Sequence, residues 1–194
     1  MKIFPVLISS PDTRMYFDTF MRLKEISDEL KKVLYFYVGR AGGVVAGRNQ
    51  SFENARKALG TGIIRGLIID DDIIIDDMPD KIAYEIAKAD RENYNIIAPY
   101  AVVKGKEHLN HYIVKEGNVE RLMSIDETLK LPKYAPVYAG GLGFYYGDVY
   151  LDYHFHADYA KGEDEYFFLD NHLTPLHVPI KLSHVKGIPV PIYD

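Results

Sequence analysis

The chain has 194 residues, which fits one α/β domain, and its 47% hydrophobic and 26% charged residues lie in the ordinary globular range. It contains no cysteine, which excludes disulfides, thiolate metal sites and cysteine nucleophiles, so any metal must be bound by oxygen and nitrogen atoms. The net charge is -5 at pH 7. Because the sequence has neither a run of about 18 apolar residues nor a signal-peptide pattern, we expect a cytoplasmic protein without a transmembrane segment.

Strands and helices are predicted to alternate through the first half of the chain. Short apolar or β-branched runs predict strands at 4–8, 33–38, 66–69 and 95–103. Helical spacing of apolar residues predicts a helix at 15–30, Ser51 is expected to cap a second helix that ends at Leu59, and a third is expected at 76–90. The order strand, helix, strand implies parallel pairing, and the alternation indicates the α/β class.

The pattern weakens in the second half. We expect an irregular hairpin or loop region at 104–136, a strand at 137–139, a helix that begins at Asp148 or Gly162 and ends at Leu169, and a last strand at 178–182. No internal repeat or linker divides the chain. One domain is therefore predicted for residues 1–194.

Three consecutive acids, Asp70, Asp71 and Asp72, follow the apolar strand at 66–69. Ligands bind at the carboxyl ends of strands in open α/β sheets, and carboxylate oxygens at such an edge suit Mg²⁺ or Mn²⁺. Like charges at close range raise each other's pKa, so a bound cation is the simplest way to keep the three acids ionised together. The sequence alone leaves open the alternative of a strand that ends in a polar turn.

The motifs around these acids resemble those of a known enzyme family. Ala46-Gly47-Arg48-Asn49, then Leu67-Ile68-Ile69-Asp70-Asp71-Asp72, look like the donor-binding half of GT-A-fold glycosyltransferases, especially the large family with an Asp-x-Asp motif. Gly162-Glu163-Asp164-Glu165 is similar to the later Glu-Asp motif of that family. The resemblance spans residues 4–184 and implies one GT-A domain with a mostly parallel sheet flanked by helices. Residues 1–103 would form its donor-nucleotide half and residues 104–194 its acceptor and catalytic half.

The resemblance also implies roles for single residues in a hexosyltransferase-type enzyme that uses Mn²⁺ or Mg²⁺. Asp72 would coordinate the metal, Asp70 would reach the metal or the donor ribose, and His184 would complete the metal shell. Asp164 would be the catalytic base that deprotonates the acceptor hydroxyl. The remaining implied contacts are with the donor, through Arg48, Asn49 and Lys186, and with the acceptor, through Gly140, Gly141 and Glu163.

The chain departs from that family where the nucleotide base is recognised. The family's acidic pair is replaced by Gly39-Arg40, so the base is not identified. We interpret the turn that begins at Ser9 as a substitute, in which Asp12 accepts a hydrogen bond from the base or ribose and Arg14 faces phosphate. Ordinary turn and N-cap chemistry is the alternative for this segment.

The predicted partners are a nucleotide-sugar donor, which leaves as a nucleoside diphosphate, and a glycan, protein or lipid acceptor. A carboxylate base favours inversion at the anomeric carbon, although enzymes with an Asp-x-Asp motif include both inverting and retaining examples. The 16 Tyr and nine Phe residues predict an aromatic-rich surface, which favours a homodimer.

Three other functions are alternatives. A sugar-phosphate nucleotidyltransferase would carry a glycine-rich loop and a basic motif after the first strand, where this chain has Ser9-Ser10-Pro11-Asp12. A metal-dependent nuclease, or any nucleic-acid partner, is disfavoured because residues 67–194 contain 22 acidic against 12 basic residues. A non-catalytic nucleotide- or glycan-binding module would keep the site without turnover.

Overall fold

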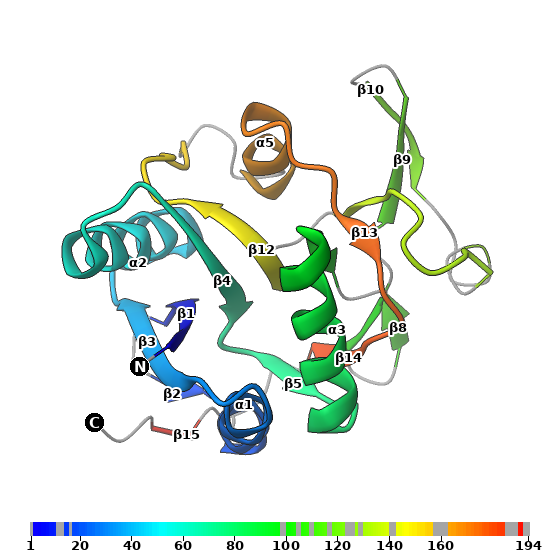
Figure 1. The fold of residues 1–194 in the computed structure, drawn as a ribbon. Helices are drawn as coiled ribbons and strands as arrows, with labels where there is room; N and C mark the ends of the chain where they lie inside the picture. Colours follow the sequence, from blue (N-terminus) through cyan, green and yellow to red (C-terminus); the bar gives the residue numbers. More distant parts are fainter. Residues whose placement is uncertain are drawn as a thin grey trace.

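A computed structural model describes residues 2–10, 14–15, 17–97, 100–103, 106–108, 111–115, 118–122, 127, 130–139, 143–156, 163–184 and 190–191. Its central sheet has the strand order β13-β6-β12-β4-β1-β3 (Figure 1). In chain order these strands are β1 (Ile3–Ser9), β3 (Val33–Gly39), β4 (Ile63–Asp70), β6 (Ile96–Ile97), β12 (Phe144–Tyr150) and β13 (Leu176–His177). Strand β12 runs antiparallel to β4 and β6, and the other neighbouring pairs are parallel. The prediction of an α/β fold with a mostly parallel sheet is confirmed.

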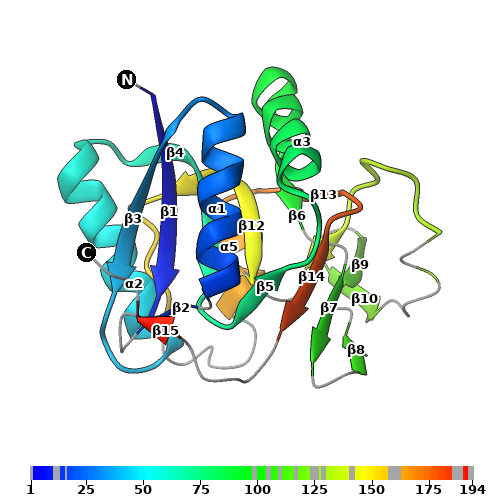
Figure 2. The ribbon, with the colours of Figure 1, turned by 90° about the horizontal axis from the view of Figure 1, so that it is seen from below.

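Helices cover both faces of this sheet. Helices α1 (Phe17–Glu29) and α3 (Pro79–Glu92) pack on one face, and α2 (Val44–Leu59) and α5 (Glu163–Asp170) pack on the other (Figure 2). Alternate residues of a strand point to opposite faces, so Ile69 of β4 packs with α1 and α3 while Ile68 packs with α2 and α5. By the same alternation, Asp70 at the end of β4 is directed to the face that α2 and α5 cover.

Helix α2 begins at Val44, so the prediction that Ser51 caps it is wrong. The chain enters the helix at Gly43, whose φ of 84° lies in a region that favours glycine. Ser51 is buried within the helix and its hydroxyl donates a hydrogen bond to the Arg48 carbonyl. The helix ends at Gly60, with φ 65°, as the sequence predicts.

Strand β12 is the largest departure from the predicted elements. Asp148, one of the two expected helix starts, lies within this strand, and the other expected start near Gly162 is confirmed by α5. Most of β12 is buried because the strand lies between β4 and β6, so its sequence lacks the alternation of polar and apolar residues that marks a half-exposed strand. Together, β12 and β13 complete a sheet whose other strands come from the first half of the chain.

The remaining strands form smaller sheets, in the orders β5-β14-β7-β8, β10-β9-β11 and β15-β2. They are β2 (Arg14–Met15), β5 (Ile73–Ile75), β7 (Tyr100–Val103), β8 (Lys106–His108), β9 (His111–Lys115), β10 (Asn118–Leu122), β11 (Tyr138–Ala139), β14 (Lys181–His184) and β15 (Val190–Pro191). The strand predicted at 95–103 is thus divided between two sheets, while β9 and β10 confirm a hairpin within 104–136. Within the described ranges, no helix is both long and apolar enough to cross a membrane.

A polar network joins α3 to the central sheet through Asp90. Its carboxylate accepts hydrogen bonds from Lys32 at 2.8 Å and from the Tyr146 hydroxyl at 2.5 Å, and it forms an ion pair with Arg65 at 3.3 Å. Burial by itself would raise the pKa of Asp90, but the hydrogen bonds from Lys32 and Tyr146 and the charges of Lys32 and Arg65 outweigh it and lower the pKa below its usual value.

We expect Asp90→Asn to lower the free energy of unfolding at pH 7 by about 1–2 kcal/mol. Because the folded pKa of Asp90 is lowered, its ionised form stabilises the protein above the unfolded value of about 3.9, and this contribution is lost as the pH falls through the folded pKa. The difference between the two proteins in urea unfolding should therefore shrink in acid. Asp152→Asn, which alters an exposed ion pair with Arg56, is the control. If the loss of unfolding free energy in Asp90→Asn persists unchanged near pH 2, its electrostatic origin is contradicted.

Candidate active site

The carboxyl ends of the central strands form a continuous row of residues. Ser9 at the end of β1 pairs with Gly39 of β3 on one side and with Asp70 of β4 on the other. The row continues to the start of β12, because the Asp70 amide donates a hydrogen bond to the Gly143 carbonyl at 3.3 Å. Two predicted donor-binding residues, Ser9 and Asp70, are thus neighbours at this edge.

Two glycines allow α2 to pack directly on this row. A Cβ on Gly47 of α2 would overlap the Ser9 hydroxyl, and a Cβ on Gly39 would overlap the Gly47 carbonyl. Since any larger side chain would force the helix away, these glycines set the close approach of α2 to β1 and β3. Arg48, the next residue of α2, is thereby held at the strand ends.

Arg48 joins two carboxylates that are far apart in the sequence. Its Nη2 donates to Oδ1 of Asp70 at 3.1 Å, and its Nη1 donates to Oδ1 of Asp164 at the start of α5. The side chain of Arg48 is 3% exposed, and those of Asp164 and Asp70 are 13% and 28% exposed. The guanidinium group also lies over the ring of Phe155, 5.8 Å from its centroid. We call Arg48, Asp70 and Asp164 the arginine cluster.

The other two acids of the triple lie in the turn that follows β4. Burial raises the pKa of Asp71, and the charges of Asp72 and Asp70 raise it further, against a hydrogen bond from Ser10 that lowers it. Beside the larger effect of burial, the two neighbouring charges thus act on Asp71 in the direction that the three consecutive acids predict. A cation at this turn would offset those charges.

Two acids at this edge, Asp70 and Asp72, are the described residues that could contribute to a divalent cation site. Asp70 and Asp72 supply carboxylate oxygens, the ligands that Mg²⁺ and Mn²⁺ prefer. Gly143 lies beside Asp70, since a Cβ built on Gly143 would be in van der Waals contact with Oδ2 of Asp70 at 3.8 Å. The backbone of His184 pairs with Ile73, the residue after Asp72, which brings this predicted ligand to the same turn. Among the side chains that the structure describes, no three His, Asp or Glu residues gather into a metal-binding group, and the His184 side chain is outside that set.

Several predicted site residues are described only in part. The backbone of Arg14 lies in β2, paired with Pro191, and the backbone of Glu163 begins α5 beside Asp164. Four others lie outside the described residues, namely Asp12, Gly140, Gly141 and Lys186. Their predicted contacts with the donor and the acceptor stay predictions.

Asn49 and Arg48 have contacts that the sequence does not indicate. The Asn49 carboxamide bonds the backbone of Phe155, and both Nη groups of Arg48 bind carboxylates of the protein. Phe155 itself is absent from the predicted site. A buried aromatic residue shortly after a strand is common in protein cores. Nothing in the sequence around Phe155 therefore indicates that it contacts Arg48.

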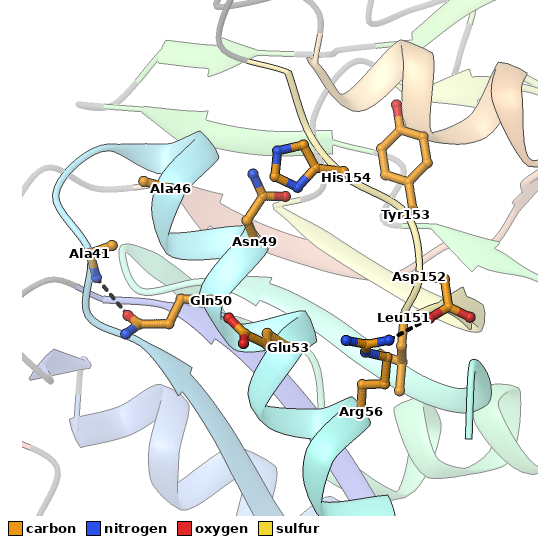
Figure 3. A pocket seen from close by; sticks show the side chains of 10 residues that line it. All are labelled: Ala41, Ala46, Asn49, Gln50, Glu53, Arg56, Leu151, Asp152, Tyr153 and His154. Atoms are coloured by element: carbon orange, nitrogen blue, oxygen red, sulfur yellow. Dashed lines mark hydrogen bonds and ion pairs between the residues drawn. The ribbon is translucent and has the colours of Figure 1, made fainter. Parts of the chain in front are cut away.

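A groove of about 590 Å³ lies on the outer side of α2, between this helix and residues 151–154 (Figure 3). It is lined by Ala41, Ala46, Asn49, Gln50, Glu53, Arg56, Leu151, Asp152, Tyr153 and His154. No residue of the arginine cluster lines it. Asn49, the residue that follows Arg48 on α2, does line it.

No protein-family model matches the chain, and no curated protein matches its sequence significantly. Function is therefore inferred from the residues at the strand ends themselves.

Proposed function

We propose that the protein is a metal-dependent glycosyltransferase of the GT-A fold, which transfers a sugar from a nucleotide-sugar donor to an acceptor hydroxyl. The observation that carries this proposal is the arginine cluster. Asp70, from the predicted donor motif, and Asp164, from the predicted base motif, bind the same guanidinium group although 116 residues separate Arg48 from Asp164. A donor-side acid and a candidate base at one sheet edge are what such a transfer requires.

In the proposed reaction, Asp164 acts on the acceptor, and Asp70 and Asp72 act at the diphosphate of the donor. On one side, a carboxylate of Asp164 would take the proton of the acceptor hydroxyl as the acceptor oxygen forms a bond to the anomeric carbon of the donor. On the other side, the bond from that carbon to the diphosphate breaks, and the nucleoside diphosphate leaves with the electron pair. Asp72 and Asp70 would hold a divalent cation, and the chemistry that such a cation would supply there is Lewis-acid stabilisation of the leaving diphosphate. Attack opposite the leaving group inverts the anomeric centre.

Arg48 has a distinct part in this proposal. Two carboxylates brought together at a half-buried edge repel each other, and a single buried guanidinium group between them offsets that repulsion. Arg48 therefore holds Asp164 at a fixed position relative to Asp70. The family resemblance implies that Arg48 contacts the donor, and its two carboxylate contacts support a role in neutralising the site as well.

Nucleotide binding tests the donor half of the proposal. We expect one nucleoside diphosphate or nucleotide sugar from a panel to raise the melting temperature by about 5–10 °C when present at a hundred times its Kd, with Mn²⁺ but not with EDTA. Asp72→Ala should abolish this shift because it removes a cation ligand. Asp28→Ala, which removes an exposed acid of α1, is the matched control and should keep it.

The outcomes separate the proposal from its alternatives. A shift that survives Asp72→Ala would contradict the role of Asp72 in binding a metal. The absence of a shift with every nucleotide would contradict the proposed glycosyltransferase function. A metal-dependent shift without release of nucleoside diphosphate from the bound nucleotide sugar would instead identify a binding module.

A further inference from the structure

The side chain of Asn49 makes two hydrogen bonds with the backbone of Phe155. Its Nδ2 donates to the Phe155 carbonyl and its Oδ1 accepts from the Phe155 amide, both at 2.8 Å. The Asn49 carboxamide thus donates one N–H and accepts one hydrogen bond through its oxygen, as the backbone of a neighbouring strand would do. Figure 3 shows Asn49 on α2, close to His154 and the segment that leads to Phe155.

Phe155 in turn contacts Arg48 and also α5, the helix that carries Asp164. Its ring lies under the guanidinium group of Arg48 and is stacked on Phe167 of α5, with centroids 5.7 Å apart and planes inclined by 13°. Phe167 is one helical turn after Asp164. Phe155 is 1% exposed and also packs edge-on against Phe52 of α2 at 5.2 Å, so its ring is confined on several sides.

These contacts form a closed ring of interactions. It runs from Arg48 to Asp164, along α5 to Phe167, across to Phe155, and back to α2 through Asn49, the residue adjacent to Arg48. We infer that Asn49 is a positioning residue, which fixes Phe155 and thereby holds Asp164 at the distance and orientation that its reaction needs. The inference rests on the proposed function, because it takes Asp164 as the base.

The test compares Asn49→Ala with Gln50→Ala. Gln50 is the next residue of α2, and its Oε1 accepts two backbone hydrogen bonds, from Arg40 at 2.6 Å and Ala41 at 2.8 Å. Each variant thus loses two side-chain contacts with backbone, but only Asn49 contacts the segment that packs on α5. The probe is whichever of UDP-glucose, UDP-N-acetylglucosamine and GDP-mannose gives the largest thermal shift with Mn²⁺, and its hydrolysis is followed by release of nucleoside diphosphate.

We expect Asn49→Ala to lower kcat by about 10- to 100-fold while the donor Kd stays within about threefold, because a small displacement of a reacting group costs turnover without affecting donor contacts. Gln50→Ala should lower the melting temperature to a similar extent and keep kcat within about threefold. Equal losses of kcat in the two variants, or an unchanged kcat in Asn49→Ala, would overturn the inference. Should Asn49→Ala fail to fold, Phe155→Leu loosens the same ring of contacts and should give the same division between kcat and Kd.

A second measurement does not depend on activity. Hydrogen exchange of the amides in α5 should be faster in Asn49→Ala than in Gln50→Ala, because only the first variant releases Phe155. If the wild-type protein hydrolyses none of the three donors, the proposed function fails, while this exchange result still tests the link from Asn49 to α5. Unchanged exchange in α5 would overturn the inference even in an active enzyme.

Discussion

Replacing Asp164 by asparagine is expected to reduce the rate of donor turnover by about 100- to 10,000-fold, the range that a positioned general base contributes. Asparagine has the size of aspartate, and its carboxamide oxygen can still accept a hydrogen bond from Arg48. It cannot take a proton from the acceptor hydroxyl at neutral pH. Steady-state release of nucleoside diphosphate at saturating donor measures the loss, and the thermal shift with nucleotide and Mn²⁺ should remain.

The matched control for this variant is Asp170→Asn. Asp170 ends the same helix, and its carboxylate accepts a hydrogen bond from the Tyr153 hydroxyl at 3.1 Å, away from the arginine cluster. This change should leave turnover within about threefold, since surface substitutions outside special contacts have small effects. If Asp164→Asn keeps the wild-type rate, another group removes the acceptor proton and the role proposed for Asp164 is wrong.

The positions of the acids at the sheet edge could be predicted because they depend on neighbouring residues alone. The apolar run that precedes Asp70 is typical of a buried strand, and strand ends in α/β sheets carry ligand sites. The structure confirms that β4 ends at Asp70. A strand also lies close to the one predicted at 178–182. It is β14, which spans Lys181–His184 and so ends at His184.

The surroundings of Arg48 could not be predicted, and the reason is the wrong start of α2. A helix that begins at Ser51 leaves Arg48 in a loop, where it would face solvent and a donor phosphate. A helix that begins at Val44 instead puts Arg48 on the same side as Ser51, Phe52 and Ala55, at helical spacings, and this is the side that faces the sheet. The glycine pair before the helix was the available signal, since Gly43 adopts the positive φ that starts it.

Strand β12 shows a second limit, which concerns pairing between distant segments. Its residues Phe144 to Tyr150 align with β4 from Ile69 back to Ile63, and this antiparallel register brings Gly143 to Asp70. No pattern within 144–150 specifies that partner, because the strand is buried on both faces and could equally be read as part of a buried helix. The position of Gly143 beside Asp70 thus depends on a tertiary contact.

Arg48→Met is expected to have the largest effect on stability, lowering the free energy of unfolding by about 3–5 kcal/mol. Methionine can fill much of the space of the arginine stem and keep contact with Phe155, so the loss isolates the guanidinium charge. Without it, Asp70 and Asp164 both lose the positive charge to which they are ion-paired. Urea unfolding measures the change, and Arg56→Met, which removes one partner of an exposed ion pair, should cost at most about 1 kcal/mol.

A double substitution separates charge from packing in this result. If repulsion between the two carboxylates causes the loss, Arg48→Met combined with Asp164→Asn should be more stable than Arg48→Met alone, because only one of the two carboxylates that Arg48 joins is then charged. Mn²⁺ should likewise raise the stability of Arg48→Met more than that of the wild type, since a cation at Asp70 and Asp72 replaces part of the missing positive charge. A loss that neither Asp164→Asn nor Mn²⁺ reduces would contradict repulsion between the two carboxylates as its cause.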